Sequence, residues 1–209
     1  RTPLALMQAQ IELFVSEHPA SQPDTAELLG LLQEQTERMS RMIKVLLEMS
    51  KLHSVPCEDA VELGPLSEEV LADLAPLAEN KGVTLDCAGD ALTIGSDTLL
   101  YQLVFNLVEN AIRYSHPGST VNVSICDTDS HVFLRVKDQG PGIPKQHRES
   151  IFQPFFRLDK SRSRAYGGAG LGLALVWEIA ALHGGTAEVE ASSENGTTML
   201  VSFPKRIPA

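Results

Sequence analysis

A glycine-rich stretch, GGAGLGLALV at 167–176, has the composition of a phosphate-binding turn, with four glycines in six residues. Such turns point backbone N–H groups at an anion, and the helix that follows adds the positive end of its dipole. The two commonest sites of this kind are excluded. A dinucleotide-binding turn needs a third glycine where Leu173 or Leu175 stands, and a P-loop needs Lys and Ser or Thr where Leu173 and Ala174 stand. The stretch is either a phosphate site of another kind or a flexible linker before a helix.

Two asparagines lie on one face of an otherwise apolar helical segment at 99–114. Asn106 and Asn110 are four residues apart, and Arg113 and Tyr114 follow one turn later. Asn is a weak helix former, and its side-chain oxygen is the kind of hard ligand that Mg²⁺ combines with water and phosphate oxygens. The pattern fits a magnesium and phosphate site, and it also fits an ordinary polar helix face.

The segment DQGPGI at 138–143 places a carboxylate at the end of a predicted strand. Asp138 could accept a hydrogen bond from an exocyclic amine, and Gly140 and Gly142 would let the backbone approach a flat base closely. The alternative is a plain turn, because Asp followed by Gly two residues later is common in turns.

A third group combines aromatic and basic side chains. FQPFFRLDKSRSR at 152–164 contains three Phe residues and the densest basic cluster of the chain, which consists of Arg157, Lys160, Arg162 and Arg164. A basic lid hinged by aromatic residues and closing over a polyphosphate would explain this composition. A solvated loop with a Phe anchor is the alternative.

The composition describes a globular chain without a basic face. Of 209 residues 43% are hydrophobic, and the net charge is −10 with a pI near 5.0. We therefore expect no nucleic-acid partner, because binding to a phosphate backbone needs a concentrated positive surface. The three cysteines fit no zinc spacing and indicate reduced thiols. No apolar run reaches the roughly 18 residues of a membrane helix, so we expect any membrane segment to lie outside this chain.

The elements that must position these groups fall into two parts. Residues 1–54 carry apolar residues at steps of three and four in two segments, separated by a proline-containing break at 18–24. The apolar stripe is wide, and two helices alone bury little surface. We expect an antiparallel helical hairpin over 1–54 that dimerises into a four-helix bundle, followed by a linker at 55–60.

The remaining part, 61–209, alternates short strands with longer helices and predicts an α+β fold, an α/β sandwich with helices on one face of a mixed sheet. Ser96 or Asp97 is the expected N-cap of the asparagine-bearing helix. Residues 139–169 are expected to be irregular. Predicted helices cover 66–79, 99–114 and 170–182, and predicted strands cover 61–63, 83–87, 92–94, 120–126, 131–138, 186–191 and 198–203.

Taken in order, these motifs resemble the catalytic region of sensor histidine protein kinases, in the ATPase superfamily shared with gyrase, Hsp90 and MutL. NLVENAIRYS (106–115) resembles the family's N box, DQGPGI its first glycine box, FQPFF its F box and GGAGLGLAL its second glycine box. RTPLA at the start resembles the tail of the H box, and RMIKVLLEMSKL (41–52) resembles the end of the second dimerisation helix. The resemblance covers nearly the whole chain.

The resemblance implies ATP and Mg²⁺ as cofactors and assigns roles to individual residues. Asn110 would bind Mg²⁺ through its side-chain oxygen, Asn106 would assist in catalysis one turn earlier, and Arg113 would reach the ATP phosphates. Tyr114 would pack against the nucleotide, and Asp138 would accept a hydrogen bond from the adenine amino group. The role of Glu109 stays open, because a merely solvated side chain also fits this position. The other implied nucleotide contacts are Gly140, Gly142, Arg157, Gly168, Gly170, Leu171 and Gly172.

The start of the chain departs from the family pattern. Thr2 matches the position that orients a water for dephosphorylating the partner, but the phosphoacceptor histidine would stand three residues before Arg1. None of the six histidines present has the H-box context, so we expect this chain to bind Mg-ATP without phosphorylating itself.

The activity implied is that of an ATP-dependent protein histidine kinase. The γ-phosphoryl group of ATP would pass to the upstream histidine and then to an aspartate of a response regulator receiver domain. The expected location is the cytoplasmic portion of a membrane sensor, and the expected assembly is a homodimer through residues 1–54. A nucleotide-gated scaffold without catalysis and an ATP-hydrolysing relative stay as alternatives. Gly170→Ala is expected to weaken nucleotide binding and to leave the melting of the apo-protein nearly unchanged.

Overall fold

The computed structural model describes residues 54–158 and 170–205 continuously, together with residues 13, 30, 32, 33, 36, 39, 40, 43 and 52. The chain divides into two compact units, Arg1–Lys51 and Leu52–Ala209. In the first unit every described position is helical, and the rest of the predicted hairpin lies outside the described residues. No helix in the described part of the chain is long and apolar enough to span a membrane.

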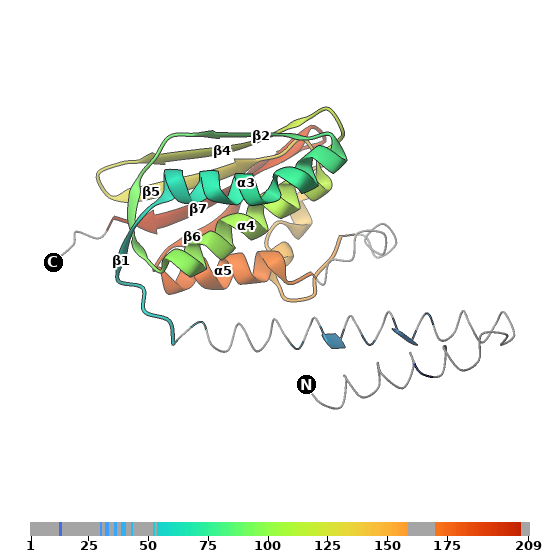
Figure 1. Cartoon of the computed structure of the whole chain (residues 1–209), viewed down its shortest axis with the longest axis horizontal. Helices are drawn as coiled ribbons and strands as arrows, with labels where there is room; N and C mark the ends of the chain where they lie inside the picture. Colours follow the sequence, from blue (N-terminus) through green and yellow to red (C-terminus); the bar gives the residue numbers. More distant parts are fainter. Residues whose placement is uncertain are drawn as a thin grey trace, which may run out of the picture. The chain divides into compact units, whose positions relative to one another are not determined.

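The second unit is a sheet covered on one face by helices (Figure 1). Its main sheet has five strands in the order β2-β4-β5-β7-β6, in which β2 pairs parallel with β4 and all other neighbours are antiparallel. The helices are α3 (Leu63–Lys81), α4 (Asp97–Tyr114) and α5 (Gly172–Leu182). The strands of the main sheet are β2 (Thr84–Ala88), β4 (Thr120–Asp127), β5 (His131–Lys137), β6 (Thr186–Ser193) and β7 (Gly196–Pro204).

The smaller elements complete the unit. β1 (Asp59–Glu62) and β3 (Leu92–Gly95) form a separate antiparallel pair. The segment between β5 and α5, expected to be irregular, contains two short 3-10 turns, η1 (Lys145–His147) and η2 (Ser150–Phe152). The predicted α+β class with a mixed sheet is confirmed.

The core lies between the helices and one face of the sheet. Side chains alternate along β5, so that Val132, Leu134 and Val136 on one face are almost fully buried. The face of α4 toward the sheet is apolar along its whole length, so burial of this face accounts for much of the hydrophobic stabilisation. Its buried residues are Leu99, Leu100, Leu103, Val104, Leu107, Val108, Ala111 and Ile112.

His183 connects the two helices that carry the predicted motifs. It lies just after α5 and is 1% exposed. Its Nε2 accepts the N–H of Ser96 at 3.0 Å, and its Nδ1–H donates to the Ile179 carbonyl at 2.7 Å. Ser96 is the N-cap residue of α4, as predicted, but its side chain makes no capping bond. The start of α4 is therefore tied to the end of α5 by a neutral imidazole.

Two helix starts differ from the prediction for identifiable reasons. α3 begins at Leu63, three residues before the predicted start, because the N–H of Leu63 bonds to Ala91 and the chain leaves β1 directly into the helix. α5 begins at Gly172 and not at Gly170. Gly170 has φ of 71°, which is a left-handed conformation that no α-helix contains.

Candidate nucleotide-binding site

The two asparagines of α4 face the first residue of α5. A Cβ atom added to Gly172 would lie 2.9 Å from Oδ1 of Asn106 and 3.4 Å from Nδ2 of Asn110. Asn106 is oriented by its own helix, because its Nδ2 donates to the Gln102 carbonyl at 2.7 Å. Its oxygen therefore points to the start of α5, where the sequence predicts a phosphate site. The N box and the second glycine box meet at this point.

Arg113 is engaged along the same helix. Its Nη2 pairs with Oε1 of Glu109 at 2.7 Å, an i,i+4 ion pair. Lys81, at the end of α3, donates from Nζ to the Arg113 carbonyl, and burial followed by repulsion from Arg113 lowers the pKa of Lys81. Glu109, whose role the sequence left open, pairs with the Arg113 guanidinium and orients it. The role of Arg113 toward phosphates stays a prediction.

Asp138 follows β5 directly, and its side chain is half-buried. Its Oδ1 accepts the N–H of Gly140 at 2.8 Å and the N–H of Thr197 at 3.1 Å. Burial raises the pKa of Asp138 above its usual range, and these two donors oppose the rise. Within the described residues no hydrogen bond to Oδ2 is formed. The second carboxylate oxygen is thus available to a ligand amine.

The first glycine box also touches the end of α4. A Cβ atom at Gly140 would lie 2.7 Å from the Tyr114 carbonyl oxygen and 3.1 Å from Oδ1 of Asp138. The Tyr114 side chain is 55% exposed. Asn106 and Tyr114 are two turns of α4 apart, roughly 12 Å along the helix axis. The C-terminal half of α4 therefore leads from the two asparagines beside α5 to Tyr114 beside the loop of Asp138.

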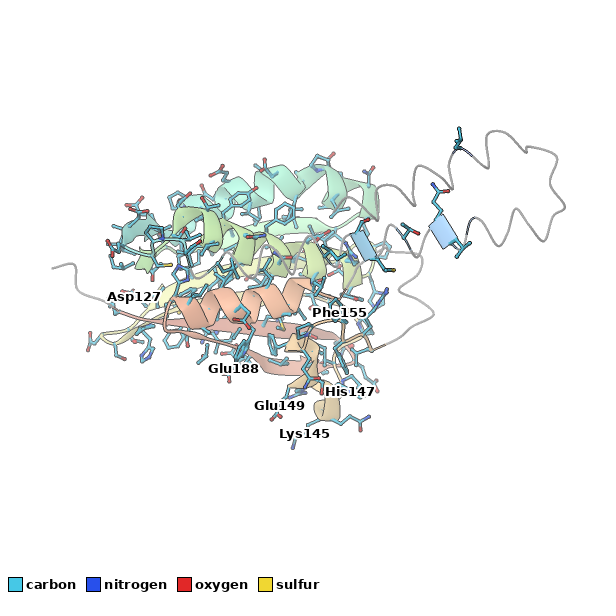
Figure 2. All side chains as sticks on the ribbon, turned by 90° about the horizontal axis from the view of Figure 1, so that it is seen from below. Asp127, Lys145, His147, Glu149, Phe155 and Glu188 are labelled. Carbon is cyan, nitrogen blue, oxygen red and sulfur yellow. The ribbon has the colours of Figure 1, made fainter. Side chains whose placement is uncertain are left out.

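The segment that carries the predicted lid is closed at its base. The N–H of Phe155 donates to the Gly170 carbonyl at 2.8 Å. Phe155 has φ of 67°, a left-handed conformation that is rare for a bulky residue. Figure 2 shows Phe155 near one end of α5, with Lys145, His147 and Glu149 farther out and Asp127 at the opposite end of the unit.

Gly170 has a structural reason to be glycine. A Cβ atom there would lie 2.8 Å from the Phe156 carbonyl oxygen and 3.2 Å from Cγ of Arg157, at a φ that side chains rarely adopt. The expectation that Gly170→Ala leaves the stability of the apo-protein nearly unchanged is therefore wrong. This contact also places Arg157 at the base of the predicted lid.

Other predicted site residues are placed as follows. Leu171 is 3% exposed, so it packs in the core beside α5. Gly142 has φ of 75° and its Cα faces the Ser193 carbonyl, so a side chain there would overlap the β6–β7 hairpin. Thr2, Gly168 and the basic residues Lys160, Arg162 and Arg164 lie outside the described residues.

The chemistry of the donors restricts what the site can bind. In the described part of the chain no cluster of three or more His, Cys, Asp or Glu side chains could hold a metal ion. Two amide side chains are too few ligands for a protein cage. They do suit Mg²⁺, which keeps several waters and takes further ligands from phosphates.

Reading the sequence alone missed Thr197, which bonds to Asp138. It also missed Ser192, which bonds to Thr197 and Ile143, and Arg148, which bonds to Ser192. These residues of β7, β6 and the end of η1 converge only because β6 and β7 pair beside β5. The only signal in the sequence was the run of small polar residues SSENGTT at 192–198. Its role can be recognised only from the strand register, which pairs Ser192 with Thr197.

Comparisons with known proteins agree with this arrangement. Residues 95–207 match the family "Histidine kinase-, DNA gyrase B-, and HSP90-like ATPase", and residues 1–55 match the "His Kinase A (phospho-acceptor) domain". The chain is 34% identical to the "Sensor-like histidine kinase SenX3" of Mycolicibacterium smegmatis, covering 98% of this chain and 54% of the relative. It is 31% identical to the "Sensor histidine kinase RppB" of Synechocystis, covering 98% of this chain and 46% of the relative. The chain thus spans about half the length of the curated relatives it matches.

A solved structure gives the same answer for the fold. The "Mycobacterial sensor histidine kinase MprB" superimposes with a TM-score of 0.61 at 30% identity, covering 71% of this chain and 98% of that chain. A helix-covered mixed sheet, an asparagine face on α4 and a carboxylate after β5 define an ATP-binding domain of this ATPase class. With the phospho-acceptor match over residues 1–55, the chain belongs to the sensor histidine kinases of two-component systems, and the resemblance first seen in the motifs is confirmed.

Proposed function

We propose that this chain is the kinase core of a sensor histidine kinase. It binds Mg-ATP along α4 and transfers the γ-phosphoryl group to a histidine just upstream of Arg1. The phosphoryl group then passes to an aspartate of a response regulator receiver domain. The observation that carries the proposal is the convergence of Asn106, Asn110 and Gly172, because it brings two motifs 62 residues apart in the chain into contact at one point.

The two ends of the nucleotide are assigned by chemistry. The free oxygen of Asp138 is an acceptor and suits the exocyclic amine of adenine. The start of α5 and the amides of α4 suit the phosphates, since helix N-termini favour anions. Arg113 and Arg157 are the described cations nearest to these groups along the chain and are proposed to contact the phosphates.

Magnesium fits the donors that are present. Asn110, with Asn106 one turn earlier, would hold it through a side-chain oxygen, and the ion would neutralise charge on the phosphates. The chain's own residues fix the direction of the γ-phosphate and the adenine ring. The histidine nitrogen forms a bond to the γ-phosphorus as the bond from phosphorus to the bridging oxygen of ADP breaks. Such transfers depend mainly on positioning and electrostatics.

Hydrolysis of ATP by water is less well supported. A hydrolase needs a general base near the γ-phosphate. Asn106 has no ionisable group, and the nearby Glu109 is paired with Arg113 at 2.7 Å. The arrangement favours transfer to an incoming nucleophile that brings its own reactive nitrogen.

The assembly and location proposed for the protein extend beyond the second unit. Leu13, Leu32 and Met39, at described helical positions, are 57%, 46% and 51% exposed in a single chain, which supports dimerisation through residues 1–54. Thr2 is proposed to orient a water when the protein dephosphorylates its partner. The protein is proposed to be the cytoplasmic part of a membrane-bound sensor.

Calorimetric titration of the 209-residue chain with ATP and Mg²⁺ tests the nucleotide site. Asn110→Ala should weaken Mg-ATP binding about tenfold or more, since it removes a charge-assisted contact. Asn80→Ala, the same change at an exposed position of α3, should leave binding unchanged. Equal affinities for wild type and Asn110→Ala would contradict the proposed site.

Phosphoryl transfer needs a separate experiment. A longer protein that includes the residues preceding Arg1 should incorporate acid-labile label from γ-labelled ATP, and Asn110→Ala should abolish the label. The 209-residue chain should bind ATP and incorporate none. Steady release of inorganic phosphate without labelled protein would instead support a hydrolase.

A further inference from the structure

The end of the β6–β7 hairpin is bonded to the loop that carries Asp138. Ser192 Oγ accepts the N–H of Ile143 at 2.7 Å and lies 3.0 Å from Oγ1 of Thr197. Thr197 in turn donates its N–H to Oδ1 of Asp138 at 3.1 Å, and the N–H of Asp138 donates to the Thr197 carbonyl at 2.9 Å. One serine hydroxyl therefore links both sides of the carboxylate loop.

Arg148 ties the same two segments together from outside. Its Nη2 donates to the Ser192 carbonyl at 2.8 Å, and its Nε lies 3.5 Å from the Ile143 carbonyl oxygen. Arg148 is half-buried and directly follows η1. Its guanidinium thus bridges the hairpin and the loop at the point where Ser192 joins them.

Packing alone does not fix this end of the hairpin. A hollow of about 340 Å³ lies beside it, lined by Lys137, Asp138, Ala191–Ser193 and Asn195–Thr198. The contacts on the other side are between backbones, since a side chain at Gly142 would overlap Ser193 and one at Gly196 would overlap Asp138. The β5–β7 ladder holds Thr197 beside Asp138. The position of the loop that follows Asp138, and with it the N–H of Gly140 that bonds to Oδ1, therefore depends on the hydrogen bonds that Ser192 and Arg148 make at Ile143.

We propose that Ser192 and Arg148 are positioning residues that set the base selectivity of the nucleotide site through Asp138. The inference rests on the proposed function. With Oδ1 fixed by two backbone N–H groups, Oδ2 is fixed as well, and it presents an acceptor in one direction. An exocyclic amine matches that acceptor, whereas a 6-oxo group at the same place repels it. A carboxylate that can rotate would lose this discrimination.

The test compares two nucleotides that differ at the base only. The affinities of the 209-residue chain for ATP and for inosine triphosphate are measured with Mg²⁺ by calorimetry. Wild type should prefer ATP. Ser192→Ala should lose about tenfold in ATP affinity, the equivalent of one weakened charge-assisted hydrogen bond, and little in affinity for inosine triphosphate. Ser192→Thr keeps the hydroxyl and should keep most of the preference.

A double-mutant cycle separates positioning from general stabilisation. If Ser192 acts through Asp138, Ser192→Ala should cause no further loss in a chain that already carries Asp138→Asn. Arg148→Gln, with Arg148→Lys as its conservative partner, provides a second route if Ser192→Ala fails to fold. Arg148→Gln should reduce the preference for ATP in the same way.

Different results would contradict the positioning role of Ser192 and the proposed nucleotide site. Equal losses for both nucleotides, or additive losses with Asp138→Asn, would show that Ser192 only stabilises the hairpin and would overturn the positioning role. The same holds if wild type prefers ATP and both Ser192→Ala and Arg148→Gln keep the full preference. Wild type that binds neither nucleotide would overturn the proposed function and, with it, this inference.

Discussion

Asp138 lowers the stability of the fold at neutral pH, and its carboxylate is the proposed acceptor for the adenine amine. Because burial raises its pKa, the folded protein binds the proton more tightly than the unfolded chain does. Stability is therefore lost as the pH rises from the ordinary carboxyl pKa through the raised one, and at neutral pH the ionised carboxylate destabilises the fold. A group of this kind is a candidate for function rather than for stability.

Asp138→Asn should separate these two effects. The amide oxygen can still accept the N–H groups of Gly140 and Thr197, and no buried charge remains, so the unfolding free energy at pH 7 should be equal or higher. The amide nitrogen then faces the adenine amine, donor against donor, and ATP affinity should fall by about 1.5–3 kcal/mol, or roughly tenfold to a hundredfold. Urea unfolding and ATP titration of the same variant measure both quantities. Lower stability with unchanged affinity would show that Asp138 is structural.

Two neighbouring glycines should respond differently to the same substitution. At Gly172 the added methyl group meets the end of the Asn106 side chain at 2.9 Å. Displacing that side chain weakens its bond to the Gln102 carbonyl, and the preference of Ala for the helix offsets this loss. Gly172→Ala should therefore weaken ATP binding at nearly unchanged stability. At Gly170 the left-handed backbone and the Phe156 carbonyl resist a Cβ atom, so Gly170→Ala should lose about 1–2 kcal/mol. Thermal melts and ATP titrations of the two variants decide between these expectations, and equal melting temperatures for them would contradict the contrast.

At the scale of elements, local patterns predicted most of the fold. The helix at Asp97–Tyr114 was predicted to within about two residues, because eight apolar residues at helical spacing lie between a capping residue and a proline-containing turn. The starts of α3 and α5 were wrong, because they depend on a backbone bond to Ala91 and on the conformation of Gly170. Propensities carry no information about either feature.

The pairing of the strands could not be predicted from the sequence, and neither could the site contacts that depend on it. The strands were predicted to within two residues of their observed ends, but nothing in β2 indicates that it pairs parallel with β4. The motif residues Asn106, Asn110 and Asp138 could be named because each lies in a recognisable local pattern. Ser192 and Arg148 could not, since their contacts join segments 44 residues apart in the chain.

The contact between α3 and α4 contains a group whose titration can be measured. Tyr101 of α4 donates from its hydroxyl to Oδ2 of Asp73 of α3 at 2.5 Å, and this bond raises the pKa of Tyr101 to about 12. The folded pKa lies above the ordinary value, so the stabilisation is complete below about pH 10 and is lost as the pH rises toward 12.

Spectrophotometric titration should therefore show one phenol that ionises later than an exposed tyrosine. Asp73→Asn should move that transition toward the ordinary value, because it removes the carboxylate that stabilises the protonated phenol. Tyr101→Phe should delete the late transition and leave the others in place. A late transition that survives Tyr101→Phe belongs to another tyrosine and would contradict the assignment.

At the scale of the whole molecule, the division into Arg1–Lys51 and Leu52–Ala209 predicts two responses in thermal unfolding. Every nucleotide contact proposed for ATP lies in the second unit, and the proposed dimer contacts lie in the first. ATP at about a hundred times its Kd should stabilise the second unit by about 2.7 kcal/mol. For a unit of this size that is a rise in Tm of roughly 5–10 °C. The transition of the first unit should respond to protein concentration instead, because dissociation accompanies its unfolding.

Differential scanning calorimetry at two protein concentrations, with and without Mg-ATP, separates the two transitions. Asn110→Ala, with its affinity lowered tenfold or more, should reduce the shift caused by ATP to about half or less and leave the concentration dependence intact, which makes it the control for ligand-specific stabilisation. Leu32→Glu, which places a charge on an exposed apolar position of the helical residues, should remove the concentration dependence and preserve the ATP shift. A single transition that responds to both ATP and concentration would mean that the units unfold together, so that nucleotide binding and dimerisation are thermodynamically coupled.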